Sequence, residues 1–288
     1  MTETKQHEAQ ALFGSEACAV FAAALFWCMI LRKAVDRMRI VCFGDSVTRG
    51  ITRVKGRLRI IKDNYPDLLR ERLAPREVEV VNQGVFNDDS EQLKRRLAAD
   101  VLSLNPDYVI IQIGGNDCNF HWQEIADRPN QVHAPIVPLG DYADNVRKIV
   151  ADIATAGSTP ILSTLLPLDP ARYYQFLTTI YGTAISHWIA VCGGIEHWHG
   201  MYNRILKQLA DSLHCALIDV RRAFKQAGEL SALLSDDGIH PTAEGYRVFS
   251  DAVHEGLLVF VNSYNARPLG RNNEMTNAPS VDDNRLLR

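Results

Sequence analysis

The chain has 288 residues, of which 47% are hydrophobic and 23% charged, and its formal net charge is −3 at pH 7. These values are typical of a soluble globular protein with one large or two small domains. There is neither a positive net charge nor a basic stripe interleaved with aromatic residues, which excludes an electrostatic case for nucleic-acid binding.

The six cysteines are scattered along the chain without Cys-x-x-Cys spacing. Two of them, Cys42 and Cys215, lie inside predicted strands. This pattern favours small buried thiols in a reducing compartment over a disulfide framework. We therefore expect a cytoplasmic protein.

Residues 1–37 form a leader ahead of the first predicted strand. Within it, residues 17–31 are an uncharged apolar run followed by Arg32 and Lys33. As a helix rising about 1.5 Å per residue, this run is shorter than the roughly 30 Å hydrocarbon core of a bilayer. If it did cross a membrane, the basic residues behind it would keep the main domain cytoplasmic. Three interpretations stay open: a membrane anchor, a segment held by a partner, or an extension absent from the natural product, because Met38 directly precedes the first strand.

From residue 38 onward, short apolar segments typical of buried strands alternate with segments whose apolar residues recur at helical spacing. The strands are expected at residues 40–43, 78–81, 108–113, 160–165 and 216–219, and the helices at 93–104, 142–153, 202–213 and 246–257. This alternation implies a parallel sheet with right-handed crossovers and helices on both faces. We expect one α/β domain over residues 38–263, followed by a disordered tail over 264–288.

The polar residues that could carry chemistry lie where predicted strands end. Ser46 follows the first strand in a Gly-Asp-Ser turn, and in open α/β sheets ligands gather beyond the carboxyl ends of the strands. Gly-Asp-Ser is also a common loop sequence, so the serine needs support from later segments. Gly84 ends the second strand, where its backbone N–H could face a developing oxyanion. Asn116 ends the third strand and could offer its side-chain amide to the same place.

Asp237 and His240 lie three residues apart across a glycine turn before the last helix. The carboxylate can hold one ring nitrogen of the histidine and leave the other free to activate a serine. Pro241 suits a first helical position, so the pair could instead simply start a helix. Together with the serine, glycine and asparagine at the strand ends, the pair favours acyl transfer.

These residues fall in four segments that occur in a fixed order: Gly44-Asp45-Ser46, Asn82-Gln83-Gly84, Gly115-Asn116-Asp117 and Asp237-Gly238-Ile239-His240-Pro241. Over about residues 38–261 the set resembles the blocks of the SGNH, or GDSL-type, esterases and lipases. The resemblance implies a flavodoxin-like, three-layer α/β/α sandwich and serine hydrolysis without metal or organic cofactor. It implies Ser46 as nucleophile with Asp237 and His240. It also implies an oxyanion hole from the Ser46 and Gly84 backbone N–H groups and the Asn116 side chain.

The glycine block departs from the family pattern. That pattern often continues as Gly-x-Ser-Gly, whereas here Gly84 is followed by Val85-Phe86-Asn87-Asp88. Asparagine enters the left-handed region more readily than other non-glycine residues, so Asn87 could keep the turn. Phe86 would bring a bulky ring close to the site and so alter the shape of the pocket.

Aromatic residues outside the four blocks are candidates for the substrate pocket. Trp122 follows the asparagine block, and Tyr173 and Tyr174 lie in residues 169–194, the least regular part of the domain. We expect this stretch to form a lid or a wall of an acyl pocket, although its aromatics could instead make a satellite core. The His-Trp-His run at 197–199 lacks an acidic partner at metal spacing, so we expect packing there rather than zinc binding.

The sequence therefore predicts a serine carboxylic-ester hydrolase that acts on a small acyl ester through an acyl-enzyme. One alternative is a non-catalytic phosphate- or nucleotide-binding flavodoxin-like module with residues 44–50 as an anion-binding turn. It lacks both G-x-G-x-x-G and G-K-[ST]. Another is a non-catalytic scaffold, which would leave the serine and histidine unused. Acyl length and leaving group stay open, because fold does not determine substrate.

Overall fold

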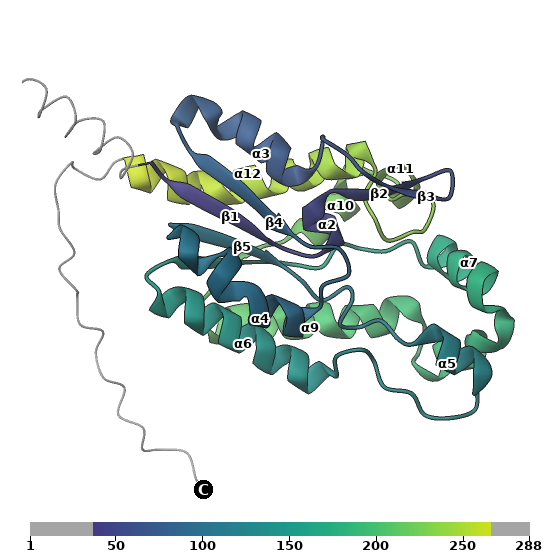
Figure 1. Ribbon diagram of the computed structural model, residues 1–288. Helices are drawn as coiled ribbons and strands as arrows, with labels where there is room; N and C mark the ends of the chain where they lie inside the picture. The colour runs from purple at the N-terminus through teal and green to yellow at the C-terminus, as the bar shows by residue number, and fades with distance from the viewer. Residues whose placement is uncertain (1–36, 266–288) are drawn as a thin grey trace, which may run out of the picture.

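The computed structural model describes residues 37–265 (Figure 1). Most of the leader, including the apolar run at 17–31, and residues 266–288 of the tail lie outside the described residues. The expected domain limits therefore stay predictions. The last helix, α12 (Ala243–Asn265), continues two residues beyond the expected end of the domain.

Within the described residues, five strands form a parallel central sheet in the order β4-β1-β5-β6-β7. Counted along the sheet-forming strands, this is the flavodoxin-like order 2-1-3-4-5. The strands are β1 (Arg39–Gly44), β4 (Glu79–Gly84), β5 (Tyr108–Gln112), β6 (Thr159–Ser163) and β7 (Ala216–Ile218).

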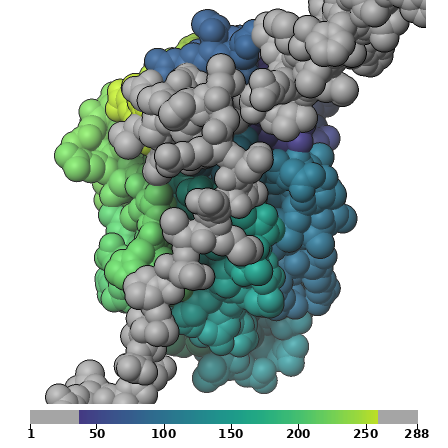
Figure 2. Space-filling view, turned by 90° about the vertical axis from the view of Figure 1, so that its left-hand side faces the viewer, coloured from purple at the N-terminus to yellow at the C-terminus, as the bar shows by residue number. Residues whose placement is uncertain are grey.

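Helices cover both faces of the sheet (Figure 1). One layer contains α3 (Tyr65–Leu73), α10 (Val220–Ala227) and α12, and the other contains α4 (Ser90–Asp100), α6 (Leu139–Thr155) and α9 (Ile195–Ser212). The predicted three-layer α/β/α sandwich is thus confirmed. In the view turned by 90°, segments from the early part of the chain (blue) and from the late part (green) lie on opposite sides of the face shown (Figure 2).

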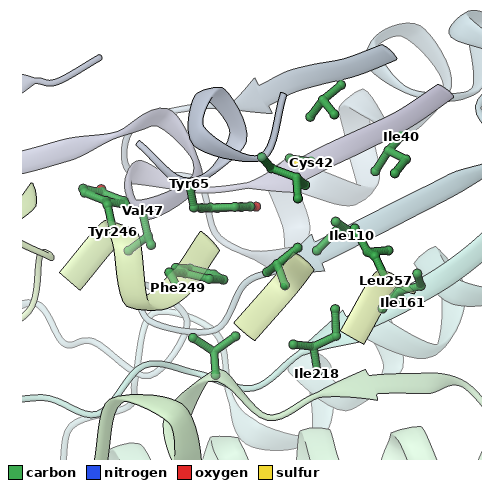
Figure 3. Close-up of a cluster of buried hydrophobic side chains, with 14 of the residues drawn as sticks. Ile40, Cys42, Val47, Tyr65, Ile110, Ile161, Ile218, Tyr246, Phe249 and Leu257 are labelled. Atoms are coloured by element: carbon green, nitrogen blue, oxygen red, sulfur yellow. The ribbon is translucent and has the colours of Figure 1, made fainter. Parts of the chain in front are cut away.

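The two layers explain why the first strand is continuously apolar. Ile40 and Cys42 of β1 face one core, whereas Val41 and Phe43 face the other. A strand buried on both faces has no polar side to present, so alternation is lost. Figure 3 shows the first of these cores, in which Tyr65 of α3 stacks on Phe249 of α12 with ring centroids 4.1 Å apart.

A small antiparallel hairpin follows the first strand and was not anticipated from the sequence. After α2 (Ser46–Arg49), strands β2 (Ile51–Val54) and β3 (Arg57–Ile60) pair across a two-residue turn. Lys55 and Gly56 both have positive φ, 50° and 74°, as a tight hairpin turn requires. Lysine at the first turn position hides the usual Asn-Gly or Asp-Gly signal.

Residues 169–194, expected to be the least regular part, are mostly helical. They contain α7 (Pro170–Tyr181), η3 (Thr183–Ile185) and α8 (Ser186–Val191). Asp169 starts α7, because its side chain accepts hydrogen bonds from the first-turn N–H groups and Pro170 suits the next position. The remaining short elements are η1 (Ala74–Arg76), η2 (Leu102–Leu104), α5 (Trp122–Asp127) and α11 (Leu230–Leu233).

No helix within residues 37–265 is long and apolar enough to cross a bilayer. The apolar run at 17–31 lies outside this range. The cytoplasmic location, with membrane anchoring through that run as the alternative, therefore stays a prediction.

Candidate active site

The nucleophile block forms a sharp turn from β1 into α2. Gly44 has no space for a side chain, because a Cβ atom there would collide with the Gln112 carbonyl oxygen and the Thr48 hydroxyl. Asp45 caps α2, and its carboxylate accepts a hydrogen bond from the Val47 N–H at 2.9 Å. Ser46 is therefore the first residue of the helix, where backbone N–H groups have no partner within the helix.

A serine, a histidine and an aspartate meet at this turn. Ser46 Oγ lies 2.9 Å from His240 Nε2, although the two residues are 194 positions apart in the chain. His240 Nδ1 lies 2.8 Å from Asp237 Oδ2. Asp237 Oδ1 accepts hydrogen bonds from the Ser235 hydroxyl and the His240 backbone N–H, and Gly238 turns the loop with φ of 74°. The structure thus joins the three residues in one hydrogen-bonded chain.

The two aspartates of the site have opposite electrostatic environments. Burial opposes ionisation of Asp237, but hydrogen bonds from the His240 ring and backbone, with the charge of that ring, outweigh it and hold the pKa of Asp237 below its ordinary value. Asp237 is therefore an anion at neutral pH and can orient the imidazole. Burial raises the pKa of Asp45 to about 7, only partly offset by the Val47 N–H and by His240.

The structure does not support the expected role of Gly84 as an oxyanion donor. The Gly84 N–H already donates to Asn82 Oδ1 at 2.9 Å, and Gly84 does not line the cavity beside Ser46. A Cβ atom at Gly84 would collide with the Arg49 backbone nitrogen. The glycine is needed because α2 packs directly on the end of β4.

Two asparagines line the cavity beside Ser46. Asn116 lines the cavity and donates one amide hydrogen to the Asp88 carbonyl at 2.8 Å, which fixes the amide and leaves a second hydrogen. Asn87 also lines the cavity and has a left-handed φ of 65°, so it keeps the turn as expected. Among the described residues, no hydrogen bond engages the Asn87 backbone N–H.

A cavity of about 280 Å³ opens beside Ser46 and His240. Its walls come from α5, α7, α8 and α9 and from the loop before α5, and they are mostly aromatic or aliphatic. Of the predicted pocket residues, Phe86, Trp122 and Tyr173 line it. Tyr174 does not: its hydroxyl lies 2.7 Å from Ser186 Oγ on the exposed side of α7. The apolar lining also includes Phe120, Phe176, Leu177, Ile180, Trp188 and Trp198.

The sequence model of the GDSL-like lipase/acylhydrolase family matches residues 42–248. The chain belongs to this family. An acetylxylan esterase of Geobacillus stearothermophilus is 25% identical over 212 residues, which cover 73% of this chain and 81% of that protein. An uncharacterized lipoprotein of Bacillus subtilis, YqeF, is 25% identical over 232 residues, 76% of this chain and 89% of that protein.

The fold of this GDSL hydrolase also matches solved structures. A lipase/acylhydrolase from Enterococcus faecalis superposes with a TM-score of 0.57 at 20% identity, covering 76% of this chain and 95% of that one. The family and the esterase relatives identify the protein as an ester-hydrolysing enzyme that acts on small ester substrates.

Two further residues of the GDSL hydrolase site could not be foreseen from the sequence. Asn119 Oδ1 accepts hydrogen bonds from Trp122 Nε1 at 2.7 Å and from the Tyr173 hydroxyl at 3.1 Å, and so ties two cavity walls together. Arg53 reaches from β2 into the cavity. Its Nε lies 3.6 Å from Asp237 Oδ2, and its guanidinium lies 4.6 Å from the centre of the Phe176 ring. Neither residue belongs to a sequence motif.

The residues of the His-Trp-His run of this GDSL hydrolase do not share one environment, because adjacent residues of a helix point in different directions. His197 is exposed, whereas Trp198 and His199 line the cavity. His199 Nδ1 accepts a hydrogen bond from Arg221 Nη1 at 3.2 Å, and burial together with the Arg221 charge lowers the pKa of His199 to about 3. His199 is therefore neutral, with its proton on Nε2. Across residues 37–265, no group of three His, Cys, Asp or Glu side chains could hold a metal ion.

Proposed function

We propose that this GDSL hydrolase cleaves carboxylic esters through an acyl-enzyme on Ser46. The supporting observation is the continuous contact from Ser46 Oγ to His240 to the ionised Asp237. His240 takes the serine proton as Oγ attacks the carbonyl carbon, and passes it to the departing alkoxide. The same histidine then deprotonates water, which attacks the acyl group and releases the acid and free Ser46.

The oxyanion hole in this proposal differs by one residue from the arrangement implied by the family resemblance. The donors are the Ser46 backbone N–H, the free amide hydrogen of Asn116 and the backbone N–H of Asn87. Asn87 replaces Gly84, because the Gly84 N–H is engaged by Asn82 and Asn87 lines the cavity. Donors held in place before the reaction stabilise the charge that develops in the transition state.

The proposed substrate carries an acyl group longer than acetyl. A relative of this chain is named for acetylxylan, yet the cavity beside Ser46 has about 280 Å³ of space and aromatic walls. Each methylene that moves from water into such walls gains about 0.8 kcal/mol. We therefore expect acyl chains of intermediate length to be preferred over acetyl.

The test combines covalent labelling with an acyl-chain series. A fluorophosphonate probe should add to the protein at Ser46, as read by intact mass and peptide mapping, and should not add to Ser46→Ala. With p-nitrophenyl esters from acetate upward, kcat/KM should rise until the chain fills the cavity. An adduct on another serine would contradict the mechanism, whereas labelling at Ser46 with highest activity on acetate would contradict only the acyl proposal.

The non-catalytic alternatives are not favoured. A phosphate-binding turn at residues 44–50 would leave the contact between Ser46 and His240 without a role. The family assignment and the esterase relatives point to hydrolysis as well.

A further inference from the structure

The β2–β3 hairpin exposes apolar and basic side chains together. Val54, Leu58 and Ile60 are 50%, 41% and 61% exposed, and Lys55, Arg57 and Arg59 are exposed between them. We refer to these six residues as the hairpin surface. Contiguous exposed apolar side chains mark sites that contact another molecule.

The register of the hairpin shows how the two kinds of side chain are arranged. Leu58 pairs with Arg53, and Arg59 pairs with Thr52. Alternate residues of a strand point to opposite faces, so Leu58 and Ile60 share one face of β3 while Arg57 and Arg59 share the other. All four residues of β3 are exposed. The hairpin therefore presents an apolar row on one face of β3 and a basic row on the other.

The hairpin surface is continuous with the mouth of the catalytic cavity. Leu58 lines the cavity and is exposed at the same time. Phe86, 43% exposed, and Ile180, 53% exposed, do the same from the loop after β4 and from α7. In Figure 1 the hairpin and α7 lie at the same end of the molecule, where the sheet strands end. Exposed apolar side chains from three elements thus surround the entrance.

The basic residues of the hairpin surface are not neutralised within the described part of the chain. Lys55, Arg57 and Arg59 have no carboxylate within 4.0 Å among residues 37–265, although the whole chain carries a net charge of −3. Basic side chains on an edge strand also discourage pairing with another strand. Protection of the edge strand alone would not explain the exposed apolar side chains around the cavity entrance.

We propose that the hairpin surface docks the enzyme on an anionic lipid surface, so that acyl chains pass from the lipid directly into the cavity. The apolar row would enter the headgroup region, while the long basic side chains reach lipid phosphates. The entry of a substrate rests on the proposed ester hydrolysis. The docking itself does not.

Docking is tested on the full chain carrying Ser46→Ala, so that turnover plays no part. Sedimentation with vesicles of phosphatidylcholine, with and without phosphatidylglycerol, measures the gain in binding that the anionic lipid brings. Residues 17–31 contribute equally in every variant. In the parent, we expect phosphatidylglycerol to raise vesicle binding at least about tenfold. The combined variant Lys55→Glu, Arg57→Glu and Arg59→Glu should abolish this gain. Raised salt should weaken the gain in the parent.

A matched control separates local from total charge. Arg95→Glu, Arg147→Glu and Lys148→Glu combined make the same charge change on exposed positions of α4 and α6, away from the hairpin. This variant should keep the anionic gain. If the hairpin variant fails to fold, the corresponding Gln substitutions remove half of the charge change and should give an intermediate loss.

The second readout uses the active enzyme. The hairpin variant should hydrolyse a soluble short ester at the parental rate but an ester embedded in anionic vesicles more slowly. The docking proposal would be overturned if phosphatidylglycerol still raised vesicle binding of the hairpin variant. It would also be overturned if the parent were a dimer and the hairpin variant a monomer with the same vesicle binding. Failure of Ser46 to react with the fluorophosphonate probe would instead overturn the proposed function and leave the vesicle result unaffected.

Discussion

At the scale of single residues, the buried Asp45 makes stability depend on pH. The pKa of this buried carboxyl is about 7 in the fold and about 3.9 in an unfolded chain, so the folded state holds its proton over the interval between them. Because the native state binds more protons there, the free energy of unfolding falls as pH rises through this interval. This loss of unfolding free energy is absent at pH values below the pKa of the unfolded chain, where Asp45 is protonated in both states.

Asp45→Asn should remove this dependence while keeping a capping oxygen. Relative to the parent, we expect the variant to gain up to about 1.4 kcal/mol of unfolding free energy per pH unit between roughly pH 4 and 7. Urea unfolding at pH 5 and pH 8 measures the difference. Asp236→Asn, on the exposed neighbour of Asp237, is the control and should change both values equally. If Asp45→Asn also changed the unfolding free energy equally at pH 5 and pH 8, the raised pKa of Asp45 would be contradicted.

Asn116 is the proposed oxyanion donor whose side chain can be removed without changing Ser46. Asn116→Ala should lower kcat by about 10²–10³-fold and leave KM nearly unchanged, because the bond is strongest in the transition state. The rate of fluorophosphonate labelling shows whether Ser46 still reacts. A kcat within a few-fold of the parent would exclude the Asn116 amide from the oxyanion hole.

At the scale of elements, α7 separates a cavity face from a solvent face at adjacent residues. Tyr173 lines the cavity and bonds to Asn119, whereas Tyr174 bonds to Ser186 outside it. Tyr173→Ala should therefore change the ratio of kcat/KM for medium-chain and acetyl esters, and Tyr174→Ala should keep the parental ratio. Equal profiles for the two variants would mean that α7 does not bind the acyl group.

The hairpin reaches the catalytic residues through Arg53. Its Nε lies 3.6 Å from the Asp237 carboxylate that holds His240, so the guanidinium helps to keep that carboxylate in place. Arg53→Met should therefore lower kcat/KM, and Arg53→Lys, which keeps the positive charge, should restore part of the loss. Equal kcat/KM in the parent and in Arg53→Met would show that Arg53 does not position Asp237.

The same elements show what a sequence can and cannot predict. The parallel strands were predictable because burial on two faces leaves an unbroken apolar run, as at Ile40–Phe43. The contact among Ser46, Asp237 and His240 was predictable because turns at the carboxyl ends of parallel strands meet at one edge of the sheet. The bond from the Gly84 N–H to Asn82 was not predictable, since no sequence pattern reveals it. Arg53 carries no motif and reaches the site only through the register of a hairpin.

At the scale of the whole molecule, the sheet order brings the two ends of the domain together. The strand that leads to Ser46 lies between β4 and β5, and the helix that follows His240 packs on α3 beside it. The proposed nucleophile Ser46 and its proposed base His240 therefore come from opposite ends of the described chain. Their contact depends on the complete sheet rather than on one local turn.

A chain that begins at Met38 should fold and hydrolyse esters at the rate of the full chain. Met38 is buried in the core, and β1 is complete from Arg39 onward. A chain that begins at Val41 is the control and should not fold, because it lacks the residues that pair with Glu79 and Val80. Thermal unfolding and kcat/KM provide the comparison. A lower Tm for the Met38 chain would place part of the leader in the fold.

Two buried cysteines allow local opening of the fold to be measured by thiol alkylation. Cys42 lies in the core between β1 and α3, and Cys118 borders the cavity (Figure 3 shows Cys42). Burial raises the pKa of the Cys42 thiol to about 12 and also raises the pKa of Cys118, so neither forms the reactive thiolate in the closed protein. Alkylation at each position therefore counts local opening events. The ratio of the alkylation rates of Cys118 and Cys42 shows whether the cavity opens independently of the central sheet.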